Sequence, residues 1–393
     1  MLRHRRRSVS GGAAIVVGVV ALIIAAGFIE WIYVAMREDT IHSGLGHLQI
    51  VRAGYPERGT IDPFSYLLPA KSADREALAT SPHVVQVAPR LKFSGLIGLK
   101  DASLSFLGEG RDPDRELGKD TIVIESGVAL SNTAPKSVIV GQGLANNLGA
   151  KVGDTVVLLV TRRDGGLGGV EVTIGGIFST PAKAYDDVAI HLPFMLANEV
   201  LQADGVHAWV VYLDQTRNTR AVTQRLVATL GADVQVIPWY DAADFYHKTV
   251  RLFSRQVLVM KIIIALVVVL AISNTMMMAV MERISEIGTA MALGVRRARM
   301  LYRFLAEGLF IGMIGGAVGV VLGYLLAGGI SKVGIPMPPP PGMARGFVGQ
   351  ILVTPGLVFD ALLLSLATAL IASAYPAWKA SRMIIADALR HGR

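Results

Sequence analysis

The sequence predicts a membrane protein with four transmembrane α-helices and a large extracytoplasmic α+β domain between the first and second helices. Of 393 residues, 52% are hydrophobic and only 17% are charged, whereas soluble domains carry about 25% charged residues. Four apolar runs are long enough to cross a bilayer. A stretch of mixed polar and apolar character, residues 37–250, separates the first run from the second.

The first apolar run covers residues 12–36 and follows a basic N-terminal segment, 1–11, that is rich in arginine. A helix over this run would be roughly 37 Å long at about 1.5 Å per residue, which is enough to span a membrane. The run exceeds the ~7–15 apolar residues of a cleaved signal peptide, and no small-x-small cleavage pattern precedes Arg37. We therefore expect an uncleaved anchor.

Residues 37–250 alternate strand-like runs with helix-like stretches, which is typical of an α+β domain. Residues 84–87 and 93–99 are predicted as two separate strands. The glycine-rich segment 162–169 is predicted as the tip of a hairpin between strands 155–161 and 170–178. A domain of this size buries a core of its own, and we expect two subdomains.

The remainder of the chain holds three more predicted spans and the segments that join them. The predicted segments are a second span at 257–281, a cytoplasmic coupling helix at 282–303, a third span at 304–330, a proline-rich outer loop at 331–354, a fourth span at 356–375 and a tail at 376–393. The loop holds Pro336 and four consecutive prolines from 338, so we expect it to be extended and not helical.

Basic residues predict the orientation of these spans. Segment 1–11 has four arginines, segment 282–303 has five, and the tail has Lys379, Arg382, Arg390 and Arg393, whereas the proline-rich loop has Lys332 and Arg345 alone. Because short cytoplasmic loops are enriched in Lys and Arg, both termini and the 282–303 segment are expected inside the cell. The protein is then a multi-pass protein of the inner (cytoplasmic) membrane.

Motif searches give no catalytic, cofactor or metal site. The tripeptide Gly118-Lys119-Asp120 has Asp where an ATP-binding loop has Ser or Thr, and a dinucleotide fingerprint starting at Gly141 fails at Asn146. H-E-x-x-H and G-x-S-x-G are absent, and there is no cysteine. The net charge of +8 comes from basic residues beside apolar spans, so nucleic-acid binding is not expected.

Small residues in the third span recur every four positions. Two sets follow this spacing, Gly308, Gly312 and Gly316, and Gly315, Gly319 and Gly323. Such ridges allow close helix packing, although glycine is common in membrane helices in general. Asn274 in the second span is expected to hydrogen-bond to a neighbouring helix.

The 282–303 segment combines acidic and basic charges with two helix-breaking glycines. Glu282 and Glu286 are four residues apart with Arg283 between them, and Gly288 and Gly294 can bend or end a helix. We interpret the segment as a short amphipathic helix at the inner membrane surface. Arginines 296 to 303 are expected to contact anionic headgroups. A basic loop that only sets topology is the alternative.

At these residues the sequence resembles the FtsX-like permease module of ABC transporters, in the group that includes MacB and LolC/LolE. The resemblance rests on Glu-Arg-x-x-Glu-Ile-Gly at 282–288, Ala292-x-Gly294, Phe304-Leu305-x-Glu307-Gly308, Pro376-Ala377-x-x-Ala380-Ser381-Arg382, Gly141-x-Gly143-Leu144-Ala145 and Gly46-His47-Leu48-Gln49-Ile50. The family often has proline shortly before its ending, where this chain has Ile384, Ile385 and Ala386, so a longer helical tail is expected.

The resemblance implies a permease subunit that transmits ATP-driven motion to its outer domain, a mechanism called mechanotransmission. Contact with the ATPase is then expected at Glu282, Arg283, Glu286, Ile287, Gly288 and Gly294. Because the chain starts at its first span, we expect a separate ATPase dimer of the LolD or MacB-ATPase type to bind ATP and Mg, and the chain itself not to be an enzyme.

The expected cargo is amphiphilic, most simply a lipoprotein or a lipid. Further expected partners are a second permease copy or a paralogue, membrane lipids, and either a periplasmic lipoprotein carrier or a membrane-fusion protein. The alternatives are export of hydrophobic peptides or drugs with a membrane-fusion partner, and a signal relay that activates a cell-wall hydrolase without transport.

Overall fold

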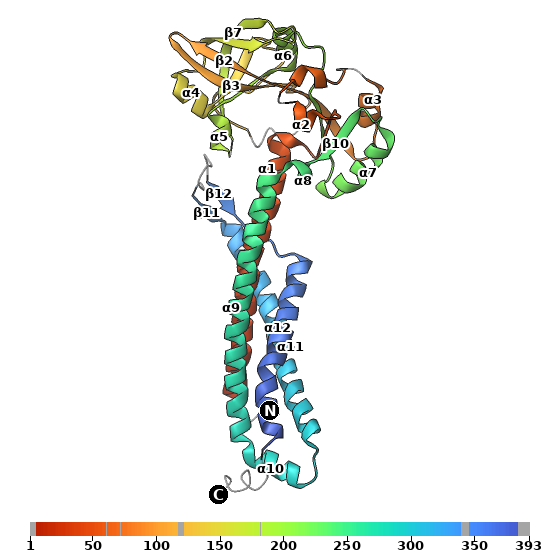
Figure 1. Cartoon of the computed structure of the whole chain (residues 1–393). Coiled ribbons are helices and arrows are strands. Elements are labelled where there is room, and N and C mark those ends of the chain that lie inside the picture. The colour runs from red at the N-terminus through yellow and green to blue at the C-terminus, as the bar shows by residue number, and fades with distance from the viewer. Residues whose placement is uncertain are drawn as a thin grey trace. The chain divides into compact units, whose positions relative to one another are not determined.

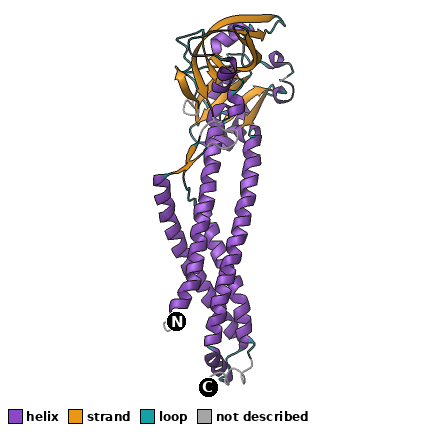
Figure 2. Cartoon of the chain, turned by 90° about the vertical axis from the view of Figure 1, so that its left-hand side faces the viewer, coloured by secondary structure: helices purple, strands orange, loops and turns teal. Residues whose placement is uncertain are grey.

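The structure is a computed structural model that describes residues 5–59, 61–70, 72–116, 122–180, 182–338 and 346–383. The chain divides into two compact units. The helical unit comprises residues up to 34, 248–337 and 348 onwards, and the sheet unit comprises 35–247 and 338–347. Figure 2 shows the long helices in the former and the strands of the main sheet in the latter.

Four long helices form the helical unit, as predicted (Figure 1). They are α1 (Arg5–Thr40), α9 (Asp244–Glu282), α11 (Arg297–Val333) and α12 (Pro355–Ser381), with the short α10 (Ile284–Ala292) between α9 and α11. All four are long and apolar enough to cross a membrane. Helix α9 begins 13 residues before its predicted span, because hydropathy marks the bilayer-crossing part of a helix and not its polar extension.

Two boundaries near the C-terminus also differ from expectation. Helix α12 continues through the buried Pro376 to Ser381, past the predicted end at 375. The first residues of the predicted outer loop, up to Val333, continue helix α11. The helix ends before Gly334, which has φ +76°. It then supplies two short paired strands, β11 (Ile335–Met337) and β12 (Phe347–Gly349). Residues 339–345 of the loop and the predicted helical tail from Ile384 lie outside the described residues.

The sheet unit holds one ten-stranded sheet. Its strands are β1 (Leu48–Arg52), β2 (Val84–Leu99), β3 (Ala102–Arg111), β4 (Val123–Gly127), β5 (Ser137–Gly141), β6 (Thr155–Thr161), β7 (Leu167–Ser179), β8 (Ala189–Pro193), β9 (Ala208–Leu213) and β10 (Val234–Pro238). Its helices are α2 (Tyr55–Arg58), α3 (Ala73–Ala79), α4 (Gln142–Leu148), α5 (Lys183–Asp186), α6 (Phe194–Leu201), α7 (Thr219–Thr229) and α8 (Trp239–Ala242), with a π-helical turn, η2 (Ile41–Leu45), after α1.

Strand β2 is shared by two parts of this sheet. Its first half pairs with β9, which continues the order β9–β1–β10, and its second half pairs with β6. Strand β6 also pairs with β7. The six strands β2, β3, β8, β5, β7 and β6, each paired with the next, therefore close into a ring. The prediction of two strands at 84–87 and 93–99 was wrong, because β2 runs without a break from Val84 to Leu99. Pro89 interrupts the strand pattern in the sequence. In the structure it stays paired in register with Trp209 of β9.

The hairpin predicted around 162–169 is present and joins β6 to β7.

The two parts of the sheet have separate apolar cores. The ring core includes Leu91, Phe106, Leu158 and Ile174, and α4 and α6 pack against it. The second core, with Ile50 and Trp209, lies between β1, β9 and the helices α3 and α7. The two cores lie within one compact unit and one continuous sheet.

Candidate coupling site

Helix α10 sits at the turn between α9 and α11, and one residue separates it from α9. That residue, Arg283, has φ −105° and ψ 16°, which is outside the helical range. At its other end, α10 stops before Gly294, whose φ of +90° strains any residue with a Cβ. These two breaks separate α10, as a short helix, from the long helices α9 and α11.

Two sides of α10 have different surroundings. Ile287, Gly288 and Met291 are buried, and Ile287 and Met291 belong to the apolar core of the helical unit. Glu286 and Leu293 are exposed, the latter to 82%. Ser285, Glu286, Thr289 and Ala292 of α10 are exposed, and so are Glu282 at the end of α9 and Leu293 just after α10. We call these six residues the exposed face of α10.

Arg283 faces inwards. Its guanidinium forms an ion pair with Glu307 of α11 at 3.5 Å, and the two side chains are 25% and 16% exposed. The pair joins the Glu-Arg-x-x-Glu-Ile-Gly motif to the Phe-Leu-x-Glu-Gly motif of the following span. Arg283 therefore holds α10 to α11 and is not free to contact another protein through its charge.

The structure thus divides the six residues expected to contact an ATPase. Glu282, Glu286 and Gly294 are exposed, whereas Arg283, Ile287 and Gly288 face the helical unit. Sequence reasoning did not single out the exposed residues Ser285, Thr289 and Leu293. Ser285 and Thr289 are four residues apart and so lie on one side of α10. Glu282 lies across the non-helical Arg283, so helical spacing alone does not place it beside them.

The six spaced glycines of α11 are buried and contact two different helices. A Cβ on Gly312 would lie 2.5 Å from Cβ of Ala369 in α12, and one on Gly319 would lie 2.7 Å from Cβ of Val19 in α1. We call Gly308, Gly312 and Gly316 the α12-facing ridge, and Gly315, Gly319 and Gly323 the α1-facing ridge. Asn274, expected to bond to a neighbouring helix, is exposed on α9.

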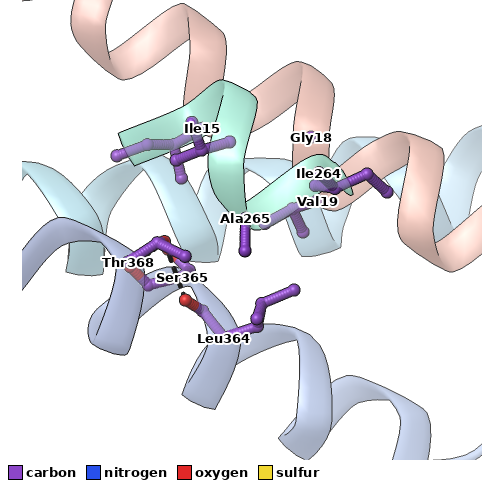
Figure 3. Close-up of a pocket in the computed structure, with 9 residues that line it drawn as sticks. Ile15, Gly18, Val19, Ile264, Ala265, Leu364, Ser365 and Thr368 are labelled. Atoms are coloured by element: carbon purple, nitrogen blue, oxygen red, sulfur yellow. Dashed lines mark hydrogen bonds between the residues drawn. The ribbon is translucent and has the colours of Figure 1, made fainter. Parts of the chain in front are cut away.

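A small hollow lies where α1, α9 and α12 meet, and apolar side chains dominate its lining (Figure 3). Its lining includes Ile15 and Val19 of α1, Ile264 and Ala265 of α9, and Leu364 of α12. Its volume is about 10 Å³, close to the minimum that holds one water molecule. This hollow does not provide a passage for a large substrate.

The first and second spans reach the sheet unit through neighbouring strands. Strand β1 follows α1, strand β10 leads to α8 and α9, and the two strands are antiparallel with Leu48 opposite Pro238. The chain therefore enters β1 and leaves β10 at the same end of the strand pair. The backbone of His47 joins both connections, because its carbonyl accepts from the Trp239 N–H at 3.0 Å.

The side chain of His47 ties the end of α1 to the sheet. Its Nδ1 accepts from the Leu213 N–H at 3.1 Å, so Nε2 carries the proton and donates to Thr216 Oγ1 at 3.2 Å. Thr216 Oγ1 in turn donates to Glu38 of α1 at 3.1 Å. Burial lowers the pKa of His47 to about 4, so the ring is neutral near pH 7.

A buried charge network lies next to this connection. Arg90 of β2 and Arg111 of β3 share Glu109 and Glu116, with N–O distances of 2.6 to 3.1 Å. Burial alone would raise the pKa of Glu109, but Arg111 and Arg90 hold it well below its usual range. A Cβ on Gly44 in η2 would lie 3.3 Å from each guanidinium, and its φ is +150°. The turn after α1 therefore rests directly on the network.

The described residues contain no group of three or more His, Cys, Asp or Glu side chains placed to hold a metal ion. Two features of the described residues stand out instead: the exposed face of α10 beyond one end of α9, and the hydrogen bonds of His47 where α1 and β10 join the sheet.

Comparison with known proteins identifies both units. Residues 13–229, more than half of the chain, match the MacB-like periplasmic core domain, and residues 258–385 match the FtsX-like permease C-terminal domain. The lipoprotein-releasing system transmembrane protein LolC of Neisseria meningitidis serogroup B is 26% identical over 275 residues, 65% of each chain. The macrolide export ATP-binding/permease protein MacB of Acinetobacter baylyi is 22% identical over 352 residues, 85% of this chain and 51% of that protein.

The matched region thus spans about half to two thirds of these relatives. Among solved structures, the periplasmic region of MacB from Actinobacillus actinomycetemcomitans matches with a TM-score of 0.37 and 13% identity, covering 54% of this chain and 94% of that one. The extracellular domain of the ABC-type transporter YknZ matches with a TM-score of 0.35 and 13% identity, covering 48% and 98%. On the strength of the two family matches, the chain belongs to the FtsX-like, MacB-type ABC transporter permeases.

Proposed function

We propose that this permease converts ATP hydrolysis, carried out by an ATPase outside these 393 residues, into a movement of its sheet unit. The observation that carries the proposal is the arrangement at His47. Two spans connect to the same end of one antiparallel strand pair, through hydrogen bonds that join both connections. A relative displacement of α1 and α9 then acts directly on the sheet.

The opposite end of α9 supplies the input in this proposal. The exposed face of α10 offers two carboxylates and an exposed leucine to a partner. The Arg283–Glu307 pair and the buried Ile287 hold α10 to the helical unit, so a push on α10 moves α9 and α11 with it. With both termini and α10 in the cytoplasm of a cell with an inner membrane, as the basic residues predict, α10 faces the compartment that contains ATP.

We further propose that the cargo is amphiphilic and is handled at the sheet unit, without passing through the helical unit. The hollow between α1, α9 and α12 is too small for a lipid, a peptide or a drug, and the larger hollow of about 410 Å³ is lined by residues of α9 alone. One relative is named for lipoprotein release and another for macrolide export. Lipoprotein or lipid extraction is our first choice and export of hydrophobic peptides or drugs the second. A signal relay to a cell-wall hydrolase is the non-transport alternative.

Reversing the charges on α10 tests the input. The full chain is purified in nanodiscs with the ATP-binding subunit that accompanies it, and ATP hydrolysis is measured for wild type and for Glu282→Lys with Glu286→Lys. We expect the ATPase to bind less tightly and its stimulation to be lost. The matched control is Arg297→Glu with Arg299→Glu, which reverses two exposed charges outside α10. Unchanged stimulation in the Glu282/Glu286 variant would refute the proposed contact.

Photocrosslinking from the sheet unit tests the cargo. Crosslinks to lipid or lipoprotein during ATP turnover support transport of an amphiphile. Crosslinks to a soluble hydrolase alone would favour the signal relay.

A further inference from the structure

An ion pair joins α9 to α12 within the apolar part of both helices. Lys261 Nζ donates to Asp360 Oδ2 at 2.7 Å. Lys261 lies four residues after Val257, where the predicted second span starts, and Asp360 lies four residues after Gly356, where the fourth starts. Each residue is therefore about 6 Å inside its apolar run, at about 1.5 Å per residue. At this depth both charges are within reach of the lipid headgroups.

This pair is more open than the Arg283–Glu307 pair at the other end of α9. The side chains of Arg283 and Glu307 are 25% and 16% exposed, whereas those of Lys261 and Asp360 are 27% and 50% exposed. An ammonium donates up to three hydrogen bonds and a carboxylate accepts several. Among the residues that the structure describes, Lys261 and Asp360 have only each other as partners. Lipid tails offer neither donors nor acceptors, so the unused groups of this pair are available to a headgroup.

An exposed apolar stripe continues from Asp360 along α12. Asp360 is the only acidic residue of this helix. Residues at steps of three and four from it lie on the same side of the helix. All of these positions are exposed and apolar, and they are Leu363, Ala367, Leu370 and Ala374. The surface thus has a charged pair at one end and an apolar track below it, which corresponds to the headgroup and acyl chain of a phospholipid.

We propose that Lys261 and Asp360 bind a phospholipid whose headgroup carries a phosphate and a primary ammonium, as phosphatidylethanolamine does. The phosphate accepts from Lys261, the ammonium donates to the Asp360 carboxylate, and an acyl chain lies along the stripe of α12. The pair selects this class of lipid by its two charges. An anionic headgroup is attracted by Lys261 but repelled by Asp360, and the quaternary ammonium of phosphatidylcholine has no N–H to donate.

The inference goes beyond the proposed function, because it concerns a lipid that stays bound to the helical unit and not the cargo. Its test therefore needs neither ATP nor an ATPase. If the lipid binds as expected and ATP hydrolysis is not coupled to the sheet unit, the proposed function fails and this inference stands.

Native mass spectrometry of the full chain tests the site. The chain is purified in detergent and titrated with equal amounts of phosphatidylethanolamine and phosphatidylcholine that carry identical acyl chains. We expect wild type to retain phosphatidylethanolamine over phosphatidylcholine by about twofold to fivefold, the range for one exposed charge-assisted contact. The mono- and dimethylated headgroups should fall between the two, because each methyl group removes one N–H donor. Equal retention of all four lipids would mean adventitious lipid only and would overturn the proposal.

Variants of the two partners separate the two halves of the headgroup. Asp360→Asn keeps the size of the side chain and removes its charge, so the preference for phosphatidylethanolamine should disappear. Asp360→Glu keeps the carboxylate and should keep the preference. Lys261→Met keeps an apolar stem and removes the ammonium, so we expect weaker binding of both lipids, since both contain a phosphate. The matched control is Lys332→Met, which removes an exposed lysine in the last turn of α11 and should change neither.

The preference is a ratio of two lipids in one sample, so it can be read from whatever folded chain each variant yields. An unchanged preference in Asp360→Asn would show that the carboxylate does not contact the ammonium, and the proposal would fail. Equal effects of Lys261→Met and Lys332→Met would overturn it as well, because the phosphate would then bind to basic residues in general. The methylated series needs wild type alone and decides the question if Asp360→Asn does not fold.

Discussion

The two glycine ridges of α11 face different kinds of neighbour. The α12-facing ridge meets the small residues Ser365, Ala369 and Ser373, so backbone approaches backbone along the whole seam. The α1-facing ridge instead receives the branched side chains of Ile15, Val19 and Ile23. Both use the same four-residue spacing on one helix.

The two seams share one property and differ in another. In both seams a Cβ on the glycine would meet Cβ atoms and main-chain carbonyls, which move only with the helix. The α1 seam adds the γ and δ carbons of Ile15, Val19 and Ile23, and at Gly323 the nearest atom is the flexible end of Ile23. Helix α1, unlike α11 and α12, continues into the sheet unit, so in the proposed mechanism it moves while α11 and α12 stay together.

The largest effect is expected in the α12 seam. In Gly312→Ala the added methyl meets the Ala369 Cβ and the Ser365 carbonyl, so we expect the free energy of unfolding in detergent to fall by about 2–3 kcal/mol. Gly328→Ala on the same helix is the control, because no atom lies within 4 Å of its Cβ, and helix propensity there favours alanine. Equal stability of the two variants would contradict the close packing.

A smaller loss of stability, about 1–2 kcal/mol, is expected for Gly323→Ala in the α1 seam, because the atom nearest to the added methyl is Ile23 Cδ1, the end of a flexible side chain. Its effect on coupling should be larger than that of Gly312→Ala. The measurement compares ATP turnover with movement of the sheet unit, which a fluorophore pair reports. If Gly312→Ala uncouples more strongly than Gly323→Ala at equal folded protein, α1 is not the moving helix.

Acidification should weaken the connection of α1 to the sheet unit. Burial lowers the pKa of His47 to about 4, so the folded state binds fewer protons than the unfolded state between pH 4 and 6.5. Stability from this group is complete above about pH 6.5 and is lost as pH falls towards 4. Hydrogen exchange of β1 at pH 7 and pH 5 measures the effect, and His47→Gln should reduce the pH dependence. His191 and His207 also have lowered pKa values, so the difference between wild type and variant isolates His47.

The smallest effect concerns one hydrogen bond in the α12 seam. Ser365 Oγ donates to the Gly312 carbonyl at 2.8 Å, and Ser365→Ala removes this bond without adding volume. We expect a loss of about 0.6 kcal/mol in unfolding free energy, the average for such bonds in membrane proteins. A loss as large as that of Gly312→Ala would show that the hydrogen bond, and not the close approach, holds the seam.

Much of this fold follows from patterns in the sequence, and the exceptions have physical reasons. Hydropathy predicts all four spans, yet it does not predict that α9 begins at Asp244, since a helix outside the bilayer has no apolar requirement. Four-residue spacing predicts two ridges on α11 but not which helix each one meets, because that depends on tertiary packing.

The geometry of the candidate coupling site follows from the sequence only in part. The charges of the 282–303 segment indicate a surface helix, but the inward turn of Arg283 depends on Glu307, more than twenty residues later in the chain. His47 shows the same limit in the sheet unit. Its partners Leu213, Thr216 and Trp239 lie more than 150 residues away in sequence, and no local pattern connects them.

The pairing of β1 with β10 also determines how the sheet unit responds to force. Because Leu48 and Pro238 are partners, the loads from α1 and α9 arrive at one end of the strand pair. Separating the two helices sideways would break the ladder bond by bond from that end, which requires little force. Sliding them in opposite directions along the strand axis would strain all the ladder bonds together, which requires much more. In the proposed mechanism the β1–β10 pair would therefore resist sliding along the strand axis and would yield first where its two connected ends are spread apart.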